Sequence, residues 1–465
     1  MEKMKIGFVP AHREPFDENW AAEMRSRCLA AFSDIDHLDI VVPDEKLTRR
    51  GCVWDDADAE KVIELFSQND IDGLIIGTMT FGDEVAALSV ASAFRDLPIL
   101  LFGTREGPFT SDGNRRSDSF CGTLSISSGL KRRDIPFQFS GIVFPEEEQF
   151  RESVANFLRV CSIAGGFLGA RIGMVGPRPE RFETCIFSED ALTQSFDQKV
   201  IPVALPEIME VAFSAEIRGE VDKMIADMKQ KADASAVDDP TLLKIAGLEY
   251  ALRDFARRKK LTGVGVQCWN AMQSIYGLSP CFAMGRLTDS GIMTACEVDM
   301  YGVLTMIIQY YAAMKTTVPH FIDWTIQHQS KENTFLAWHC GNAPGSLVCP
   351  SCKVELSYQS VLGVSLGIDH SMGTGEFQLK PGPVTFCRLQ EHEGMFKLLI
   401  AGGEAKQSDE KLRGSWSWVE VPDLDHLYRT LVMEGFTHHA SMIHGDYTEV
   451  LADACDFLGI EAVIV

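Results

Sequence analysis

Two carboxylates in the second half of the sequence stand where acidic side chains are unusual. Glu297 lies in the run Ala295–Gly302, at the start of an apolar helical pattern, where an acid also suits the positive end of a helix dipole. Asp323 lies inside the strand-like apolar run His320–Trp324. A carboxylate there is costly unless it is paired with a cation or bound to a metal ion. Each acid alone has an ordinary structural explanation, as a helix-start acid or a paired buried acid.

Three of the chain's 11 histidines gather in one segment near the C-terminus, namely His438, His439 and His444. They could be incidental residues of a surface turn, but imidazole suits transition metals and carboxylate suits harder ions. Combined with Glu297 and Asp323, the segment supplies a Glu, an Asp and a His that can leave coordination positions open. That set is what a catalytic metal ion needs when it binds substrate oxygens.

Alternating strand and helix patterns must position these side chains. In residues 1–166, apolar runs such as 5–10 and 73–77 alternate with helical patterns, and residues 167–325 repeat the alternation. Both segments therefore predict an α/β domain with a doubly wound parallel sheet, in which the loops after the strands bind ligands. Residues 326–465 contain short alternating runs between Gly and Pro turns, which predicts a mainly β C-terminal domain that completes the active site.

Charge and cysteine content exclude several classes of partner. The chain has 465 residues and a net charge of −23, and such a surface repels phosphate backbones and anionic membranes. The first residues lack a secretory signal, and no apolar run is long enough to span a bilayer, so we expect a cytoplasmic protein. Its 13 cysteines should then be reduced. The CxxC pair Cys349 and Cys352 lacks the second half of a structural zinc site.

Four motifs occur in the order seen in the L-fucose and L-arabinose isomerases. They are Cys-Glu-Val-Asp-Met-Tyr-Gly at 296–302, Phe-Ile-Asp at 321–323, Trp-His-Cys-Gly-Asn at 338–342 and His-His at 438–439. The chain resembles this family over nearly its whole length, most strongly from about residue 263 onward. It is shorter than typical fucose isomerases and is similar to the short members, which include sulfoquinovose isomerases.

This resemblance implies a metal site and a set of substrate contacts. Fucose isomerases bind Mn²⁺ through a Glu, an Asp and a His, which fall on Glu297, Asp323 and His439, and Co²⁺ or Mg²⁺ are alternative ions. A second histidine ligand of the arabinose isomerases corresponds to His339. Glu297 and Asp323 are also the candidates for acid and base. The expected substrate contacts, drawn from the motifs and from strand-end loops, are Gln267, Trp269, Arg13, His339, Asn342 and Trp416. Trp416, two residues before Trp418, could instead pack a core.

The implied reaction moves a proton between C1 and C2 of a sugar through a cis-enediolate. The first expectation is an unmodified sugar such as L-fucose, D-arabinose or L-arabinose. The first alternative is a sulfoquinovose isomerase, which converts a glucose with a C6 sulfonate to 6-deoxy-6-sulfofructose. Arg13, Arg105, Arg388 or Arg413 would then hold the sulfonate. The second alternative is a non-catalytic sugar-binding protein.

The resemblance further implies a homo-hexamer in which the first domain of one subunit walls the active site of a neighbour. The sequence agrees with this in one respect. All metal-ligand candidates follow residue 263, yet the first third forms a complete α/β unit with its own loops. A monomer whose first domain folds over its own second domain is the alternative.

Overall fold

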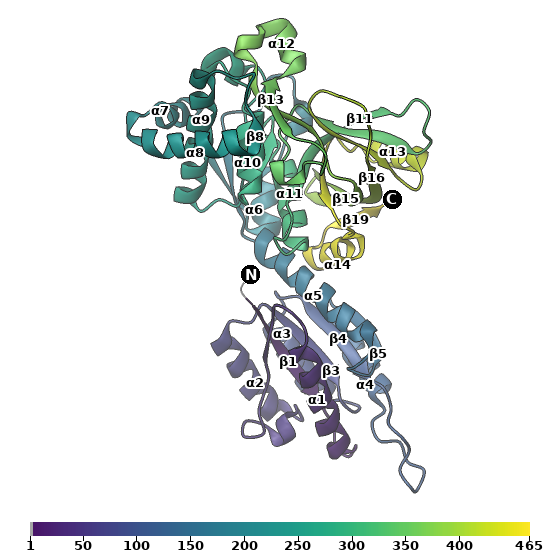
Figure 1. Cartoon of the computed structure of the whole chain (residues 1–465). Coiled ribbons are helices and arrows are strands. Elements are labelled where there is room, and N and C mark those ends of the chain that lie inside the picture. The colour runs from purple at the N-terminus through teal and green to yellow at the C-terminus, as the bar shows by residue number, and fades with distance from the viewer. Residues whose placement is uncertain (1–2) are drawn as a thin grey trace. The chain divides into compact units, whose positions relative to one another are not determined.

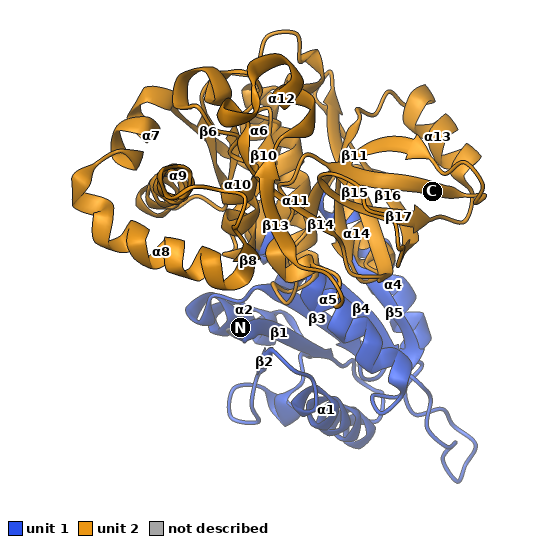
Figure 2. Cartoon of the chain, turned by 45° about the horizontal axis from the view of Figure 1, so that its top comes forward, with its two compact units in different colours: residues 1–165, 456–458 blue, residues 166–455, 459–465 orange. Residues whose placement is uncertain are grey.

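The computed structural model describes residues 3–465, which form two compact units (Figure 2). The first unit comprises the chain up to Gly165 together with Asp456–Leu458, and the second comprises Gly166–Cys455 and Gly459–Val465. The division of the second part into two domains near residue 325 stays a prediction. Within the described residues, no helix is both long and apolar enough to cross a membrane.

A five-stranded parallel sheet organises the first unit, with strand order β2-β1-β3-β4-β5 (Figure 1). Its strands are β1 Met4–Ala11, β2 Leu38–Val41, β3 Gly73–Thr78, β4 Ile99–Thr104 and β5 Gln138–Val143. Its helices are α1 Glu18–Ser33, α2 Asp56–Asn69, α3 Glu84–Ala93, α4 Ser119–Lys131 and α5 Glu148–Phe167. Asp17, Asp55 and Asp83 begin α1, α2 and α3 by accepting backbone N–H groups, which satisfies donors that have no partner inside the helix.

Helices cover both faces of this sheet, because its central strands are apolar on both sides. One core contains Phe8 and Phe102 of the sheet with Phe32 of α1 and Phe157 of α5. The other core lies on the opposite face, between the sheet and α2, α3 and α4. This is the doubly wound arrangement that the continuous apolar strands predict.

The second unit begins with a four-stranded parallel sheet of order β10-β9-β6-β7. Its strands are β6 Arg171–Val175, β7 Lys199–Val203, β9 Gly263–Val266 and β10 Met293–Cys296. The helices of this region are α6 Glu189–Phe196, α7 Leu205–Ala212, α8 Arg218–Lys231, α9 Asp239–Lys259, α10 Cys281–Asp289 and α11 Met300–Ala312. Helix α11 is buried almost entirely, since it packs against β9 and β10 on one side and against β15 and β18 on the other.

A ten-stranded mixed sheet completes the second unit, in the order β19-β16-β15-β18-β11-β12-β17-β14-β13-β8. Its strands are β8 Ala232–Asp233, β11 His320–Gln327, β12 Thr334–His339, β13 Val354–Tyr358, β14 Met372–Gln378, β15 Gly382–His392, β16 Met395–Lys406, β17 Ser415–Glu420, β18 His439–His444 and β19 Glu461–Ile464. Strand β16 also pairs with β17, so the strands from β16 through β15, β18, β11 and β12 to β17 close into a barrel. The remaining helices are α12 Ser360–Leu366, α13 Leu424–Met433 and α14 Thr448–Leu458. The expected fold class, parallel α/β sheets followed by a mainly β region, is confirmed.

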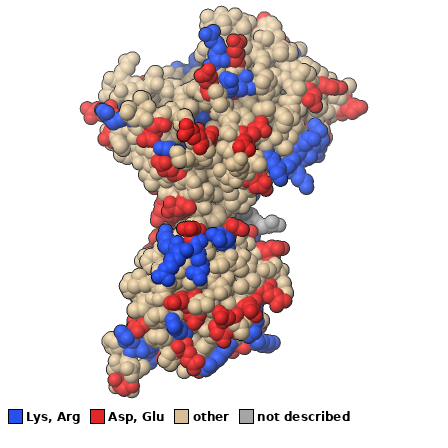
Figure 3. Space-filling model, turned by 180° about the vertical axis from the view of Figure 1, so that it is seen from behind, with Lys and Arg blue, Asp and Glu red and all other residues tan. Residues whose placement is uncertain are grey.

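Acidic and basic side chains are mixed over the face drawn in Figure 3. In the described chain, several charged side chains pair within about one helical turn, as Arg218 does with Asp222 and Lys223 with Glu220. Exposed pairs of this kind add little to stability, typically below about 1 kcal/mol each.

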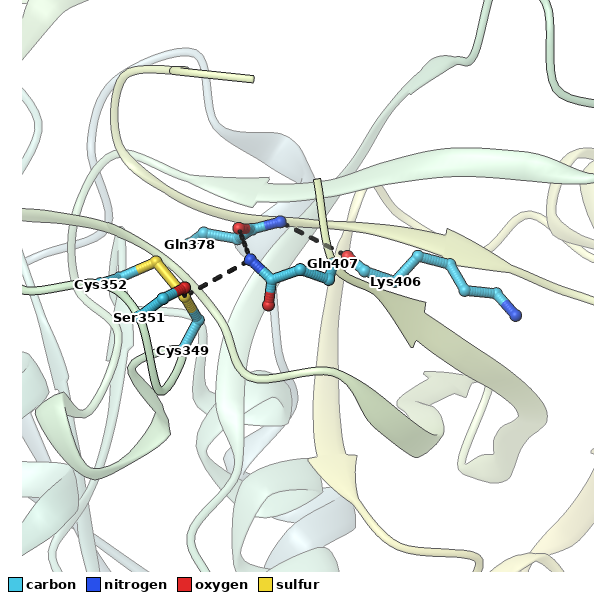
Figure 4. Close-up of a disulfide and its surroundings, with 6 residues drawn as sticks. All are labelled: Cys349, Ser351, Cys352, Gln378, Lys406 and Gln407. Carbon is cyan, nitrogen blue, oxygen red and sulfur yellow. Dashed lines mark hydrogen bonds between the residues drawn. A yellow bond between two sulfur atoms is a disulfide. The ribbon is translucent and has the colours of Figure 1, made fainter. Parts of the chain in front are cut away.

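One pair of cysteines departs from the expectation that all are reduced. Cys349 and Cys352 form a disulfide, and Gln407 donates hydrogen bonds to Cys349 Sγ and to Gln378 Oε1 beside it (Figure 4). The two Cα atoms are 5.1 Å apart, which lies within the range that a disulfide spans. The tight turn between the cysteines thus permits a disulfide, although a cytoplasmic location predicts reduced thiols.

Candidate active site

The carboxyl ends of two neighbouring parallel strands supply the first part of the site. Gln267 and Cys268 follow β9, and Glu297 follows β10, which pairs with β9 in register. The Glu297 N–H donates to Cys268 Sγ, and the Cys268 thiol donates to Glu297 Oε1, each at 3.4 Å. The Glu297 side chain is therefore fixed from one side, at the sheet edge where parallel α/β sheets bind ligands.

The turn that carries Glu297 has a strained backbone. Glu297 and Val298 both adopt left-handed conformations, with φ of 54° and 58°, which is rare for a β-branched residue. The helix expected from about Glu297 starts instead at Met300, because the N-cap is Asp299, whose side chain accepts the Gly302 N–H. The helix-start role considered for Glu297 thus belongs to Asp299, and Glu297 is left to face the site.

The barrel supplies the second part of the site. Asp323 on β11 and His439 on β18 are register partners in an antiparallel pair, so their side chains share one face of the sheet. Asp323 therefore does lie within a strand, as its apolar flanks predict. The pairing joins residues more than a hundred positions apart in the chain.

Glu297 and Asp323 both lie beside His439. His439 Nε2 lies 3.4 Å from Glu297 Oε2 and 3.7 Å from Asp323 Oδ1. These two carboxylate oxygens are buried, yet neither forms a hydrogen bond with any residue of the described range 3–465. Donor atoms at this spacing fit neighbouring ligands of one ion with bond lengths of roughly 2.0–2.4 Å. His439 therefore fits a divalent metal ion together with Glu297 or with Asp323, and each acid belongs to a group of potential ligands that contains His439.

The electrostatics of Glu297 favour the same interpretation. Burial, then the charges of the neighbouring Cys268, Cys340 and Asp323, raise the pKa of Glu297 well above its ordinary value. An ionised carboxylate is therefore unfavourable here until a cation arrives. A metal ion would stabilise the ionised form.

Two residues to which sequence reasoning gave no such role, Asp299 and Arg388, hold His439 in place. Asp299 Oδ2 lies 2.9 Å from His439 Nδ1, and the same oxygen accepts a hydrogen bond from Arg388 of β15. All three side chains are at most 2% exposed. Burial tends to raise the pKa of Asp299, but Arg388 and the His439 hydrogen bond outweigh it and hold that pKa below its ordinary value. The sequence signal for Arg388, a cation within an apolar strand, was available but was interpreted as a sulfonate contact.

Of the other histidines considered, His339 and His438 lie near the candidate metal ligands and His444 does not. A ring nitrogen of His339 lies within 4.8 Å of Glu297 and His439 ligand atoms, and His438 belongs to a similar group with Asp323 and His439. His444 Nε2 bonds the Lys380 carbonyl oxygen instead. The metal-ligand role of His339 stays a prediction.

The predicted substrate contacts differ in their surroundings. Gln267 and Trp269 are half-buried in the loop after β9, and Trp269 packs against Phe182. Asn342 is buried, and its amide donates to Cys296 Sγ at 3.5 Å. Trp416 is 2% exposed within an apolar cluster with Leu336, Trp418, Trp338 and Leu412, so it packs a core, and its contact with a sugar stays a prediction.

The other arginines that were predicted to hold a sulfonate have partners within their own units. In the first unit, Arg13 follows β1, stacks over Phe81 and lies 3.9 Å from Glu84. Arg105, after β4, bonds Glu147 at 3.0 Å. In the second unit, Arg413 bonds Glu376 and stacks over Tyr358.

Comparisons with known proteins show which families the two ends of the chain match. Residues 7–168 match the family described as fucose/sulfoquinovose isomerase, N-terminal domain, and residues 337–465 match the L-fucose isomerase C-terminal domain. The chain is 23% identical to sulfoquinovose isomerase of Priestia megaterium (strain ATCC 12872 / QMB1551), over 100% of both chains. It is 27% identical to sulfoquinovose isomerase of Clostridium sp. (strain MSTE9), over 84% of this chain and 86% of that protein. A similar protein of Alkalicoccus urumqiensis, also named sulfoquinovose isomerase, is 24% identical over 82% of this chain and 83% of its own length.

The matched domains at both ends of the chain place the protein among the sugar isomerases, and Glu297 at the end of β10, beside Asp323 and His439 of the barrel, suits this class. The chain belongs to the fucose isomerase-like family. The alternative of a non-catalytic sugar-binding protein is therefore not supported.

Proposed function

We propose that this protein is a metal-dependent aldose–ketose isomerase that converts sulfoquinovose to 6-deoxy-6-sulfofructose. The names of the similar proteins support this substrate over the unmodified sugars that the motifs first suggested. The position of Glu297 Oε2 and Asp323 Oδ1 beside His439 Nε2 is the observation that carries the metal-dependent part.

Glu297, Asp323 and His439 would hold a divalent cation, with Mn²⁺ as the leading candidate and Co²⁺ or Mg²⁺ as alternatives. A set of two carboxylates and one imidazole suits such ions, and bond formation would satisfy the two unbonded carboxylate oxygens. When bound, the ion would supply Lewis acid stabilisation for negative charge that develops on the sugar oxygens.

The same two carboxylates are the candidates for proton transfer. One removes the proton from the carbon beside the carbonyl, and a proton then returns to the neighbouring carbon, which exchanges aldose and ketose. Glu297 is 5% exposed, so a proton that it takes up is shielded from exchange with bulk water. Asp323 is more open, with 20% of its side chain exposed.

A sulfonate needs a cation or several N–H donors at the far end of the sugar. Arg388 is committed to Asp299 and Arg413 to Glu376, so neither is free for this role. Arg13 keeps 43% of its side chain exposed and, beside its stacking over Phe81, has a long ion pair with Glu84, which makes it the leading candidate from a strand-end loop. Arg178, in the loop after β6, lies at the same sheet edge as Gln267 and is the second candidate.

The role of Arg13 would follow from assembly. We infer a cytoplasmic homo-hexamer with shared active sites, because the first unit has its own strand-end loops but holds none of the metal-ligand candidates. A subunit would then lend its Arg13 to a neighbour.

A substrate comparison tests the proposed function. Purified protein with Mn²⁺ is incubated with sulfoquinovose, L-fucose, D-arabinose or L-arabinose, and products are followed by NMR. We expect kcat/KM for sulfoquinovose to exceed that for each unmodified sugar by at least about 10²-fold, since a site built to bind a charged group rejects ligands that lack it. Equal or faster conversion of an unmodified sugar would overturn the substrate assignment.

A further inference from the structure

We propose that the two buried histidines of this site are held in opposite tautomers, so that His439 offers a bare Nε2 to the metal ion whereas His339 offers an N–H donor to the substrate. The identity of the substrate rests on the proposed function. The tautomers rest on the hydrogen bonds of the protein itself.

The partners of His439 place its proton on Nδ1. Asp299 Oδ2, 2.9 Å away, can only accept, and Arg388 donates to the same oxygen. The other oxygen, Oδ1, accepts the Gly302 N–H at 2.8 Å, so the carboxylate is fixed at both ends. With Nδ1 protonated, the neutral ring keeps its lone pair on Nε2, which faces the two candidate carboxylate ligands. A carboxylate behind a metal-binding imidazole is the usual arrangement that fixes tautomer and ring orientation.

Two atoms of Cys340 contact His339 Nδ1. The backbone N–H of Cys340 donates to it at 2.9 Å, and a backbone N–H can only donate. Cys340 Sγ lies 3.2 Å from the same nitrogen and can be the donor of that pair. A nitrogen that accepts carries no hydrogen, so the ring carries its hydrogen on Nε2. A protonated Nε2 has no lone pair for a metal ion, so the expected role of His339 as a second histidine ligand is replaced by that of a donor.

His339 lies beside the candidate metal ligands. A ring nitrogen of His339 is within 4.8 Å of ligand atoms of Glu297 and His439, and the ring is buried with 3% exposure. The sugar oxygens at the two reacting carbons gain negative charge as the enediolate forms, and a fixed N–H donor stabilises such an oxygen. Removal of one donor of this kind typically lowers kcat by about 10²–10³-fold.

NMR on metal-free, ¹⁵N-histidine-labelled protein tests the tautomers directly. We expect His439 to carry its proton on Nδ1 and His339 on Nε2, with signals assigned from His439→Gln and His339→Gln. A His339 ring protonated on Nδ1, or a His439 ring protonated on Nε2, would overturn the proposal.

Binding of Mn²⁺ alone, followed by electron paramagnetic resonance, tests the division of roles. His439→Gln should weaken Mn²⁺ binding at least tenfold, whereas His339→Gln should leave it within about threefold. Asp299→Asn permits the opposite His439 tautomer and should weaken binding by about 10–100-fold. His444→Gln, a control whose ring bonds a carbonyl away from the site, should change nothing. Equal loss of affinity in His339→Gln and His439→Gln would show two histidine ligands and overturn the proposal.

Turnover of sulfoquinovose adds the catalytic readout. His339→Leu should lower kcat by about 10²–10³-fold with unchanged Mn²⁺ affinity, and His339→Gln, which keeps an N–H donor, should recover part of it. A His339→Leu variant with wild-type kcat would contradict the donor role. The NMR and Mn²⁺ measurements need no sugar, so a failure of the substrate assignment would not be confused with a failure of the tautomer assignment.

Discussion

Glu297 occupies a position that is unfavourable without a cation. Its backbone is left-handed, its side chain is buried, and Oε2 accepts no hydrogen bond within residues 3–465. A strained backbone conformation costs on the order of 1–3 kcal/mol, and such strain clusters at functional sites. The strained turn and the unbonded oxygen together identify Glu297 as the central residue of the site.

The Glu297→Gln variant tests the catalytic role of this residue. The amide is almost isosteric but neutral and a poor base, so we expect a folded protein whose kcat falls by about 10²–10⁴-fold. Steady-state kinetics and circular dichroism measure both quantities. A folded variant that keeps a tenth or more of the wild-type kcat would show that Glu297 is neither acid nor base.

The same substitution should stabilise the metal-free protein at high pH. Burial raises the pKa of Glu297, so between its ordinary value near 4.5 and the raised value the unfolded chain ionises before the folded one. Wild-type stability is therefore lost as pH rises through this window, by about 1.4 kcal/mol per pKa unit. Urea unfolding with a chelator should show the variant more stable at pH 8 and no more stable at pH 4. Equal pH dependence of the two proteins would contradict the raised pKa.

At the residue scale, sequence reasoning finds the side chains that are out of place and misses those that support them. Glu297, Asp323 and the histidine segment stand out because acids and clustered histidines are unusual in apolar runs, and the family resemblance points to His439 within that segment. The structure places both acids beside His439. The sequence suggests no role for Asp299 beyond its place in the same motif as Glu297. No local pattern reveals that Asp299 pairs with Arg388, 89 positions away. Its role depends on the tertiary fold.

At the element scale, the N-terminus of α11 joins helix formation to the site. Asp299 caps the helix, orients His439 and neutralises the buried Arg388. Asp238 caps α9 in the same way, with its side chain accepting the Thr241 N–H, but at an exposed position. The two caps therefore form a matched pair that separates capping from the buried ion pair.

We expect Asp299→Ala to destabilise the protein by about 3–5 kcal/mol, because it leaves a buried guanidinium unpaired. Asp238→Ala should cost about 1 kcal/mol, the usual loss of an N-cap. Guanidinium chloride unfolding of both variants measures the difference. Similar losses would show that the Asp299–Arg388 pair contributes little beyond the cap.

The existence of the elements was predictable, whereas their long-range pairing was not. Continuous apolar strands between helices predict parallel sheets, and short alternating runs predict the β region. The register that sets Asp323 opposite His439, and the pairing of β12 with β17, join segments far apart in the chain. Local periodicity carries no information about such pairs.

At the scale of the whole molecule, the proposed shared active sites require that the protein assembles into a homo-oligomer. Light scattering of active protein at micromolar concentration should give a mass about six times the 51.5 kDa of the chain, in keeping with a closed homo-oligomer. Mixing Arg13→Gln subunits with Glu297→Gln subunits should restore part of the activity if sites are shared between subunits. A mass of 51.5 kDa for fully active protein would contradict the shared-site arrangement.

Anomalous X-ray scattering at the manganese edge, from crystals of protein loaded with Mn²⁺, tests the central claim most directly. We predict one peak per subunit, bounded by Glu297 Oε2, Asp323 Oδ1 and His439 Nε2 at roughly 2.0–2.4 Å, with His339 outside bonding distance. A peak at another place in an active protein, or none at these three residues, would contradict the account.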